Sequence, residues 1–163
     1  MLVSQFQEAR RFMGRLDAGQ DMVAAFVTIC KDNGVRSGWI QVAAFLRNAV
    51  IQSPLEDGTG LGEACVFPGV LVFPNVQGNV SLRGDAVDVR LYAAGYGVGG
   101  DGVAALGLLQ GGEVISCEFF LVASDDVSLV RDVEDGDLAP WVQLQTAPET
   151  RPRPVMSVPL EGP

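Results

Sequence analysis

The residues Gly95–Gly100 read GYGVGG and match the G-x-G-x-x-G spacing of loops that bind the pyrophosphate of a dinucleotide. Such a loop has to follow a parallel strand and open a helix, because the phosphates bind at the helix N-terminus. The residues before it, VDVRLYAA, are typical of a strand, but VAALGLL and further glycines follow it, and they do not predict a helix. We therefore interpret Gly95–Gly102 as the connection of a β-hairpin, and we expect no cofactor.

Histidine is absent from the whole chain of 163 residues. Its absence removes the commonest general base and the commonest metal ligand, and it excludes Ser-His-Asp and Cys-His catalysis. The three cysteines, Cys30, Cys65 and Cys117, are far apart and odd in number, so they indicate neither a disulfide framework nor a metal knuckle. We assign no catalytic residues and no metal site, and these absences favour a protein that is not an enzyme without deciding the question.

Polar residues on the predicted strands form one candidate ligand site. Arg90 and Tyr92 could together form an anion-binding or hydrogen-bonding site. Gly107 and Glu113 lie on the next strands and complete the candidate set. The alternative is that Arg90 is an ordinary surface arginine and Tyr92 a packed tyrosine.

Charge is distributed unevenly along the chain, whose net charge is −9. An acidic protein repels nucleic acid unless its cations gather in one patch. Only the N-terminal part has the composition for such a patch, because acidic residues outnumber basic ones after it. The candidate nucleic-acid-binding residues are Arg10, Arg11, Arg15, Arg151 and Arg153.

The N-terminal third predicts one strand and one helix. The segment FMGRL, Phe12–Leu16, is typical of a short strand. Apolar residues then recur at helical spacing, so residues 20–33 are predicted to form one amphipathic helix. Asp17 is expected to cap this helix, Asp21 to lie in its first turn, and Gly34 to end it.

The remainder of the chain predicts strands and turns. Ser37–Gln52 is predicted to form two strands that meet near Phe45, and Ser53–Glu63 a loop. A hairpin turn is predicted at Arg83–Asp85, followed later by two strands that separate at Gly111–Gly112.

This order of elements predicts an α+β fold, a mostly antiparallel β-sheet with one principal helix. We place the domain at residues 1–126 and an acidic, proline-rich tail, partly extended or disordered, at residues 127–163. Trp141 in this tail either packs onto its own domain or docks onto a neighbouring subunit. No apolar run has the length of a signal-peptide core or a membrane span, so we expect a cytoplasmic protein without membrane contact.

The ordered set of segments resembles the plants-and-prokaryotes conserved (PPC) domain, which also occurs in plant AT-hook nuclear-localised proteins. The segment RLDAGQDMVAAFVTICKDNGVRSGWI is similar to the opening strand, acidic turn and helix of the family. FLRNAVIQSP and PGVLVFPNVQGNVSL are similar to its next strands, and VRLYAAGYGVGGDGVAALGLLQGGEVISCEFFLVAS to its closing hairpin. The resemblance covers about residues 12–124 and implies a compact domain that assembles as a homotrimer.

Two departures from the family pattern limit what the resemblance implies. Many prokaryotic members carry histidines on the strand before the Gly-rich turn and on the one after it. In this chain those positions fall at Arg90, at Tyr92 and near Gly107, so a metal-dependent activity is not expected to carry over. Plant members contact DNA through an Arg-Gly-Arg-Pro hook, whereas RPRP here has a proline in place of the glycine.

Three functions remain open from the sequence. The first is a non-enzymatic homotrimeric module that binds an unknown protein partner or serves regulation. The second is DNA binding, which the family's usual description suggests and the net charge disfavours. The third is a small-molecule site or an active site in a cleft between subunits, near Arg90 and Tyr92.

Overall fold

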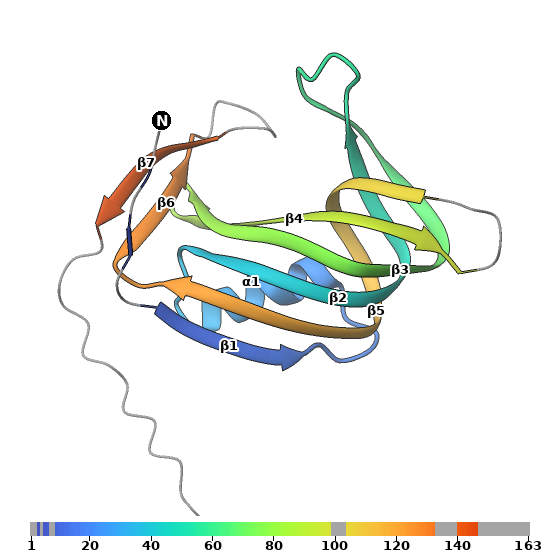
Figure 1. Ribbon diagram of the computed structural model, residues 1–163, viewed down its shortest axis with the longest axis horizontal. Coiled ribbons are helices and arrows are strands. Elements are labelled where there is room, and N and C mark those ends of the chain that lie inside the picture. Colours follow the sequence, from blue (N-terminus) through green and yellow to red (C-terminus); the bar gives the residue numbers. More distant parts are fainter. Residues whose placement is uncertain (1–2, 4, 7–8, 99–103, 133–139, 147–163) are drawn as a thin grey trace, which may run out of the picture.

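The computed structural model describes residues 3, 5–6, 9–98, 104–132 and 140–146. The element bounds are β1 (Ala9–Arg15), α1 (Met22–Asp32), β2 (Gly38–Pro54), β3 (Leu61–Arg83), β4 (Ala86–Gly97), β5 (Ala104–Ser124), β6 (Val127–Arg131) and β7 (Trp141–Thr146). This confirms the predicted α+β class, with a mostly antiparallel sheet and one helix among the described residues (Figure 1). No described helix has the length and hydropathy to cross a membrane.

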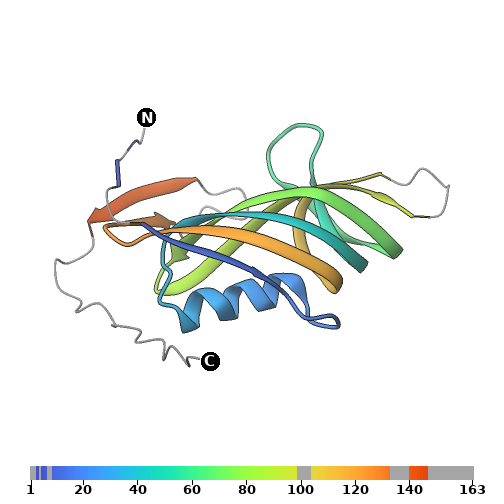
Figure 2. The same ribbon diagram turned by 60° about the horizontal axis from the view of Figure 1, so that its bottom comes forward.

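All strands belong to one 7-stranded sheet in the order β1-β5-β2-β3-β6-β7, and β4 pairs with both β3 and β5. Since β5 also pairs with β2, the strands β2, β3, β4 and β5 close into a ring of neighbours. The helix α1 lies against one face of this sheet, below it in Figure 2, and leaves the other face without a helix. The chain thus forms two layers, a strongly curved sheet and one helix.

The helix begins and ends at residues that satisfy its free backbone groups. Asp21, and not Asp17 as predicted, is the N-cap, because its carboxylate accepts the Ala24 N–H at 2.9 Å. The second oxygen of the same carboxylate accepts the Gly112 N–H of β5 at 2.8 Å. At the other end Gly34 has a φ of +63° and donates to Lys31, which confirms the predicted helix stop.

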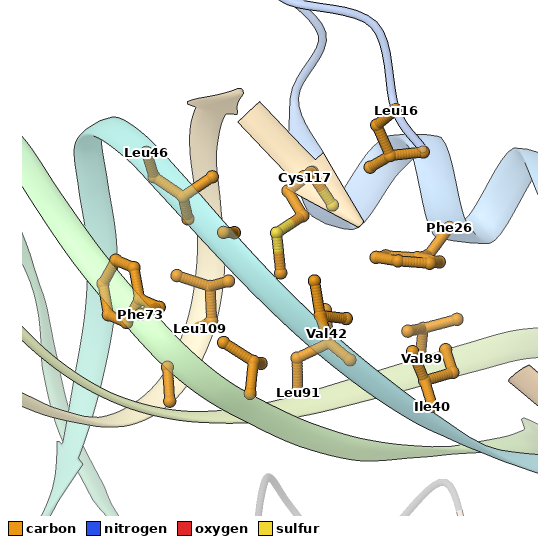
Figure 3. Packing of buried hydrophobic residues seen from close by; sticks show 14 of the residues in the cluster. Leu16, Phe26, Ile40, Val42, Leu46, Phe73, Val89, Leu91, Leu109 and Cys117 are labelled. Atoms are coloured by element: carbon orange, nitrogen blue, oxygen red, sulfur yellow. The ribbon is translucent and has the colours of Figure 1, made fainter. Parts of the chain in front are cut away.

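Apolar side chains from α1 and the facing side of the sheet form the core (Figure 3). The ring of Phe26 lies edge-on to that of Phe119, with centroids 5.1 Å apart. On β2 the side chains alternate strictly between exposed and buried from Trp39 to Leu46, which is the pattern of a strand with one covered face. Cys30 and Cys117 lie in this core, whereas Cys65 is exposed.

Two predicted strand breaks are wrong. Strand β2 runs through Phe45 as one strand of 17 residues, because it is paired on both sides and absorbs its bends as irregularities in register. Asn48 provides one of these bends with a φ of +52°. Strand β5 likewise continues through Gly111–Gly112, where its register against β2 shifts.

The predicted turns are placed correctly. Arg83 pairs with Ala86, so Gly84 and Asp85 form the tight connection of the β3–β4 hairpin. Strands β4 and β5 are antiparallel and start their pairing at Tyr96 and Ala104, which confirms a hairpin at the Gly-rich segment and excludes a dinucleotide loop there. Residues 99–103 lie outside the described part of the chain.

Part of the segment predicted as a tail extends the sheet. Strand β6 pairs with β3 in parallel at Leu82–Arg83, and β7 pairs with β6. Trp141 packs onto its own domain, where the Arg131 guanidinium lies 5.5 Å from the centre of its ring. Ordered structure therefore reaches beyond residue 126.

The core position of two cysteines predicts their reactivity. Burial raises the pKa of Cys30 to about 12 and that of Cys117 to about 11, so neither forms a thiolate near pH 8. We expect a thiol reagent at pH 8 to modify one thiol per folded chain, Cys65, and three after denaturation. Modification of three thiols in the folded protein at the same rate would contradict the packing described here.

Candidate functional site

The face of the sheet opposite α1, named the outer face below, is built from rows of side chains that neighbouring strands place side by side. The rows are Arg11, Val122, Trp39, Asn79 and Arg90; then Met13, Phe120, Gln41, Gln77 and Tyr92; then Ser116, Phe45, Val72 and Tyr96. Each row joins residues that are far apart in the sequence and adjacent in the sheet. The predicted pair Arg90 and Tyr92 thus lies on this face, in adjacent rows.

The outer face is rich in exposed apolar side chains. Met13 is 81% exposed, and Leu106, beside Ala94, is 66% exposed. Trp39, Phe45 and the two tyrosines of β4 are also exposed. An apolar surface that spans several strands is typical of a site of protein association.

One end of the outer face carries a buried polar cluster. Arg90 is 5% exposed, and its Nε donates to Asp88 Oδ2 at 3.1 Å. Arg131 of β6 is 6% exposed, and its Nε lies 3.4 Å from the same oxygen. The Arg131 guanidinium also donates to Ser81 Oγ at 3.1 Å and to Asn79 Oδ1 at 2.8 Å. A single carboxylate thus bridges two buried guanidinium groups.

The electrostatics of this cluster depend on Asp88. Burial, and then the nearby charge of Arg90, lower the pKa of Arg131, whereas Asp88 raises it. Arg90 is therefore not a surface arginine, and its Nε is bound within the protein. Sequence reasoning missed Arg131, although it is the one cation in the acidic stretch between Asp125 and Trp141.

The remaining predicted ligand residues do not join Arg90 and Tyr92. Gly107 lies opposite Ala93, with a φ of +150°, and a Cβ there would be 2.2 Å from the Gln52 carbonyl oxygen. Close packing of two strands thus explains this glycine. Glu113 forms an ion pair with Arg47 at 2.8 Å across β5 and β2.

The site does not fit a metal ion. The described residues contain no group of three or more cysteine, aspartate or glutamate side chains that could hold one. Where many family members carry histidines, two guanidinium groups lie beside the one carboxylate, and they repel a cation. Asp88 is already bound to both of them.

The N-terminal arginines separate into two groups. Arg11 and Arg15 lie on the outer face of β1, on either side of Met13. Arg10 points to the other side, where it binds the Asp125 carboxylate at 2.6 Å and the Asn33 carbonyl at 2.7 Å. Arg10 is therefore already paired and does not add a free positive charge to the predicted patch. Arg151 and Arg153 lie outside the described residues.

The shared carboxylate predicts a large effect of one substitution. In Asp88→Asn the two guanidinium groups lose the carboxylate that bridges them, and we expect a loss of about 3 kcal/mol in the free energy of unfolding, the lower end for breaking a buried ion pair. Chemical denaturation measures it. Asp85→Asn in the exposed β3–β4 turn is the matched control and should change stability by less than about 0.5 kcal/mol. Equal stability of the two variants would contradict the role of Asp88.

Comparison with solved structures identifies the fold. A plant- and prokaryote-conserved (PPC) protein from Pyrococcus horikoshii is similar with a TM-score of 0.76 and 25% identity, over 89% of this chain and 99% of that one. A metal-containing protein from Archaeoglobus fulgidus is similar with a TM-score of 0.76 and 24% identity, over 88% of this chain and 100% of that one.

A third similar structure, from Bacteroides thetaiotaomicron, is named provisionally as a DNA-binding protein. It has a TM-score of 0.68 and 18% identity, over 80% of this chain and 90% of that one. No protein-family model and no curated protein matches the sequence. The structural likeness nevertheless extends over most of the chain and confirms the fold that the sequence resemblance implied: this chain has a PPC-domain-like fold.

Proposed function

We propose that this protein is a non-enzymatic homotrimeric PPC-domain module that acts in partner binding or regulation. The observation that carries the proposal is the outer face, where apolar side chains from β1, β2, β4 and β5 are exposed in one chain. Their burial between copies removes this area from water, which is the main favourable term in protein association. A closed ring of copies covers the same face on every subunit.

The arrangement of the sheet supports assembly in a second way. Strands β1 and β7 end the strand order and therefore present unpaired backbone groups. Exposed edges pair with other chains unless they are covered or charged, and β1 carries three arginines. Symmetric closure of a trimer protects such edges from open-ended pairing.

The buried polar cluster supports a structural role rather than catalysis at the Arg90 position. Both guanidinium groups are almost fully buried, and Arg131 ties β6 to β3 and β4 through three side chains. A catalytic base with a pKa near 7 is the usual requirement for acid–base chemistry, and the chain has no histidine to supply it. The cluster thus anchors the β6–β7 hairpin beside the proposed assembly surface.

Light scattering after size exclusion tests the assembly. Three copies of the 17.2 kDa chain have a mass of about 52 kDa. We expect this mass for the wild type and about one third of it for Phe45→Glu, because a charge in the middle of the outer face cannot be buried unpaired. Thr28→Glu on the exposed side of α1 is the control and should keep the wild-type mass. A monomeric wild-type protein would refute the proposal.

A second candidate function is DNA binding, and one specific observation favours it. Arg11 and Arg15 are both exposed on the edge strand β1, four positions apart. The similar protein from Bacteroides thetaiotaomicron is named provisionally as a DNA-binding protein. The net charge of −9 opposes this function.

Fluorescence anisotropy with a random-sequence duplex, measured across a series of salt concentrations, tests this candidate. If the two arginines contact phosphates, Arg11→Ala/Arg15→Ala reduces the slope of log affinity against log salt by about 2. Lys31→Ala, on α1, is the control and should leave the slope unchanged. If the wild type does not bind at low salt, this candidate is excluded.

A further inference from the structure

An apolar pocket of about 310 Å³ opens where the β6–β7 hairpin meets the ends of β2 and β5. Its walls include Trp39 and Val122 from adjacent positions of the sheet, Val127 and Leu129 from β6, and Trp141 from β7. Trp39 and Val122 belong to the first row of the outer face, so the pocket is continuous with the proposed assembly surface. Val3 and Phe6 from the N-terminal segment of the same chain also line it.

The other end of the molecule carries an apolar projection. Residues 50–66, named the arm below, are the distal ends of β2 and β3 with their connecting loop, and they project from the sheet (Figure 1). Val66 is 62% exposed on this arm, and Leu55 at its tip is also exposed. The arm is thus a convex apolar surface, and the pocket is a concave one.

The arm is also acidic. It contains Glu56, Asp57 and Glu63 and no lysine or arginine. The Thr59 N–H and hydroxyl both donate to the Asp57 carboxylate, which lowers the pKa of Asp57 and keeps it charged. The arm therefore brings three negative charges to whatever surface it meets.

Two arginines lie next to residues of the pocket wall. Arg11 is the β1 neighbour of Val122 in the first row of the outer face, and Arg36 directly precedes Ser37. Both arginines are exposed. Of the two acidic residues nearby, Asp125 is bound by Arg10, and Asp126 accepts a hydrogen bond from the Ser124 hydroxyl of the wall. The apolar lining of the pocket and the two exposed arginines beside it thus complement the arm.

We infer that the pocket receives the arm of a second copy of this chain. The arm and the β6–β7 hairpin lie at different ends of the sheet in both views (Figures 1 and 2), so one chain cannot fill its own pocket with its own arm. A contact between two different surfaces of identical chains is heterologous, and such contacts form a ring when the rotation between copies closes. This inference rests on the proposed homotrimer and specifies the contact that would close it.

Intersubunit cross-linking tests the inference, because Cys65 lies on the arm and is the one exposed cysteine among the described residues. Val127→Cys places a second thiol in the pocket wall. Treatment of the assembled full-length variant with a short bismaleimide should link most chains into covalent dimers and trimers on a denaturing gel. Leu129→Cys provides a second pocket position should Val127→Cys fail to fold.

Two controls make the result specific. Cys65→Ser/Val127→Cys has lost the arm thiol and should give no covalent oligomers. Thr28→Cys, with Cys65 retained, places the second thiol on the exposed side of α1 and should also give none.

The mass of each variant, measured by light scattering, distinguishes a failure of the arm–pocket contact from a failure of the trimer itself. A mass of about 52 kDa without cross-links, with the pocket thiol open to a small maleimide, would overturn the inference and leave the trimer standing. The same result would indicate a pocket free for a small apolar ligand. A mass of 17.2 kDa would refute the trimer and the inference together.

Discussion

Strand β2 is hydrogen-bonded along most of its length to β3 on one side and to β5 on the other, and this double pairing determines both faces of the sheet. Because side chains alternate along a strand, burial of Ile40, Val42, Ala44 and Leu46 against the helix layer places Trp39 and Phe45 on the opposite side. A register slip of one residue would exchange the two sets. The exposed apolar face is therefore a direct consequence of how the core is built.

The buried cluster of Arg90, Asp88 and Arg131 is the second feature on which the architecture depends. Two guanidinium groups share one carboxylate in a region of little solvent, and Ser81 and Asn79 accept further hydrogen bonds from Arg131. The cluster attaches the short strand β6, which otherwise pairs with β3 at two positions only, to the rest of the sheet. It also occupies the place where a metal site would be expected from the family resemblance, with charges of the wrong sign.

The elements that follow from local patterns could be predicted from the sequence, and those that depend on distant partners could not. The helix and its stop at Gly34 are encoded within about fifteen residues, and the β3–β4 turn by Gly84 itself. The continuity of β2 was missed because it results from pairing with residues up to 85 positions away, such as Gly38 with Ala123. In the candidate site Arg90 and Tyr92 were predicted together, and alternation along β4 places them on one face. The role of Arg131 was missed because it binds Ser81, which lies 50 positions earlier in the sequence.

The carboxylate of Asp21 bonds to both Ala24 and Gly112, residues separated by most of the length of the domain. The N-terminus of α1 is therefore fully hydrogen-bonded only when β5 is in place. Formation of the helix, which depends mostly on local contacts, is thus coupled to the closure of a long loop between Asp21 and Gly112. In folding terms, the helix cannot gain its full stability early and wait for the sheet. In the native state the same hydrogen bond resists fraying of the first helical turn. We therefore expect this turn and the irregular Gly111–Gly112 segment of β5 to open together.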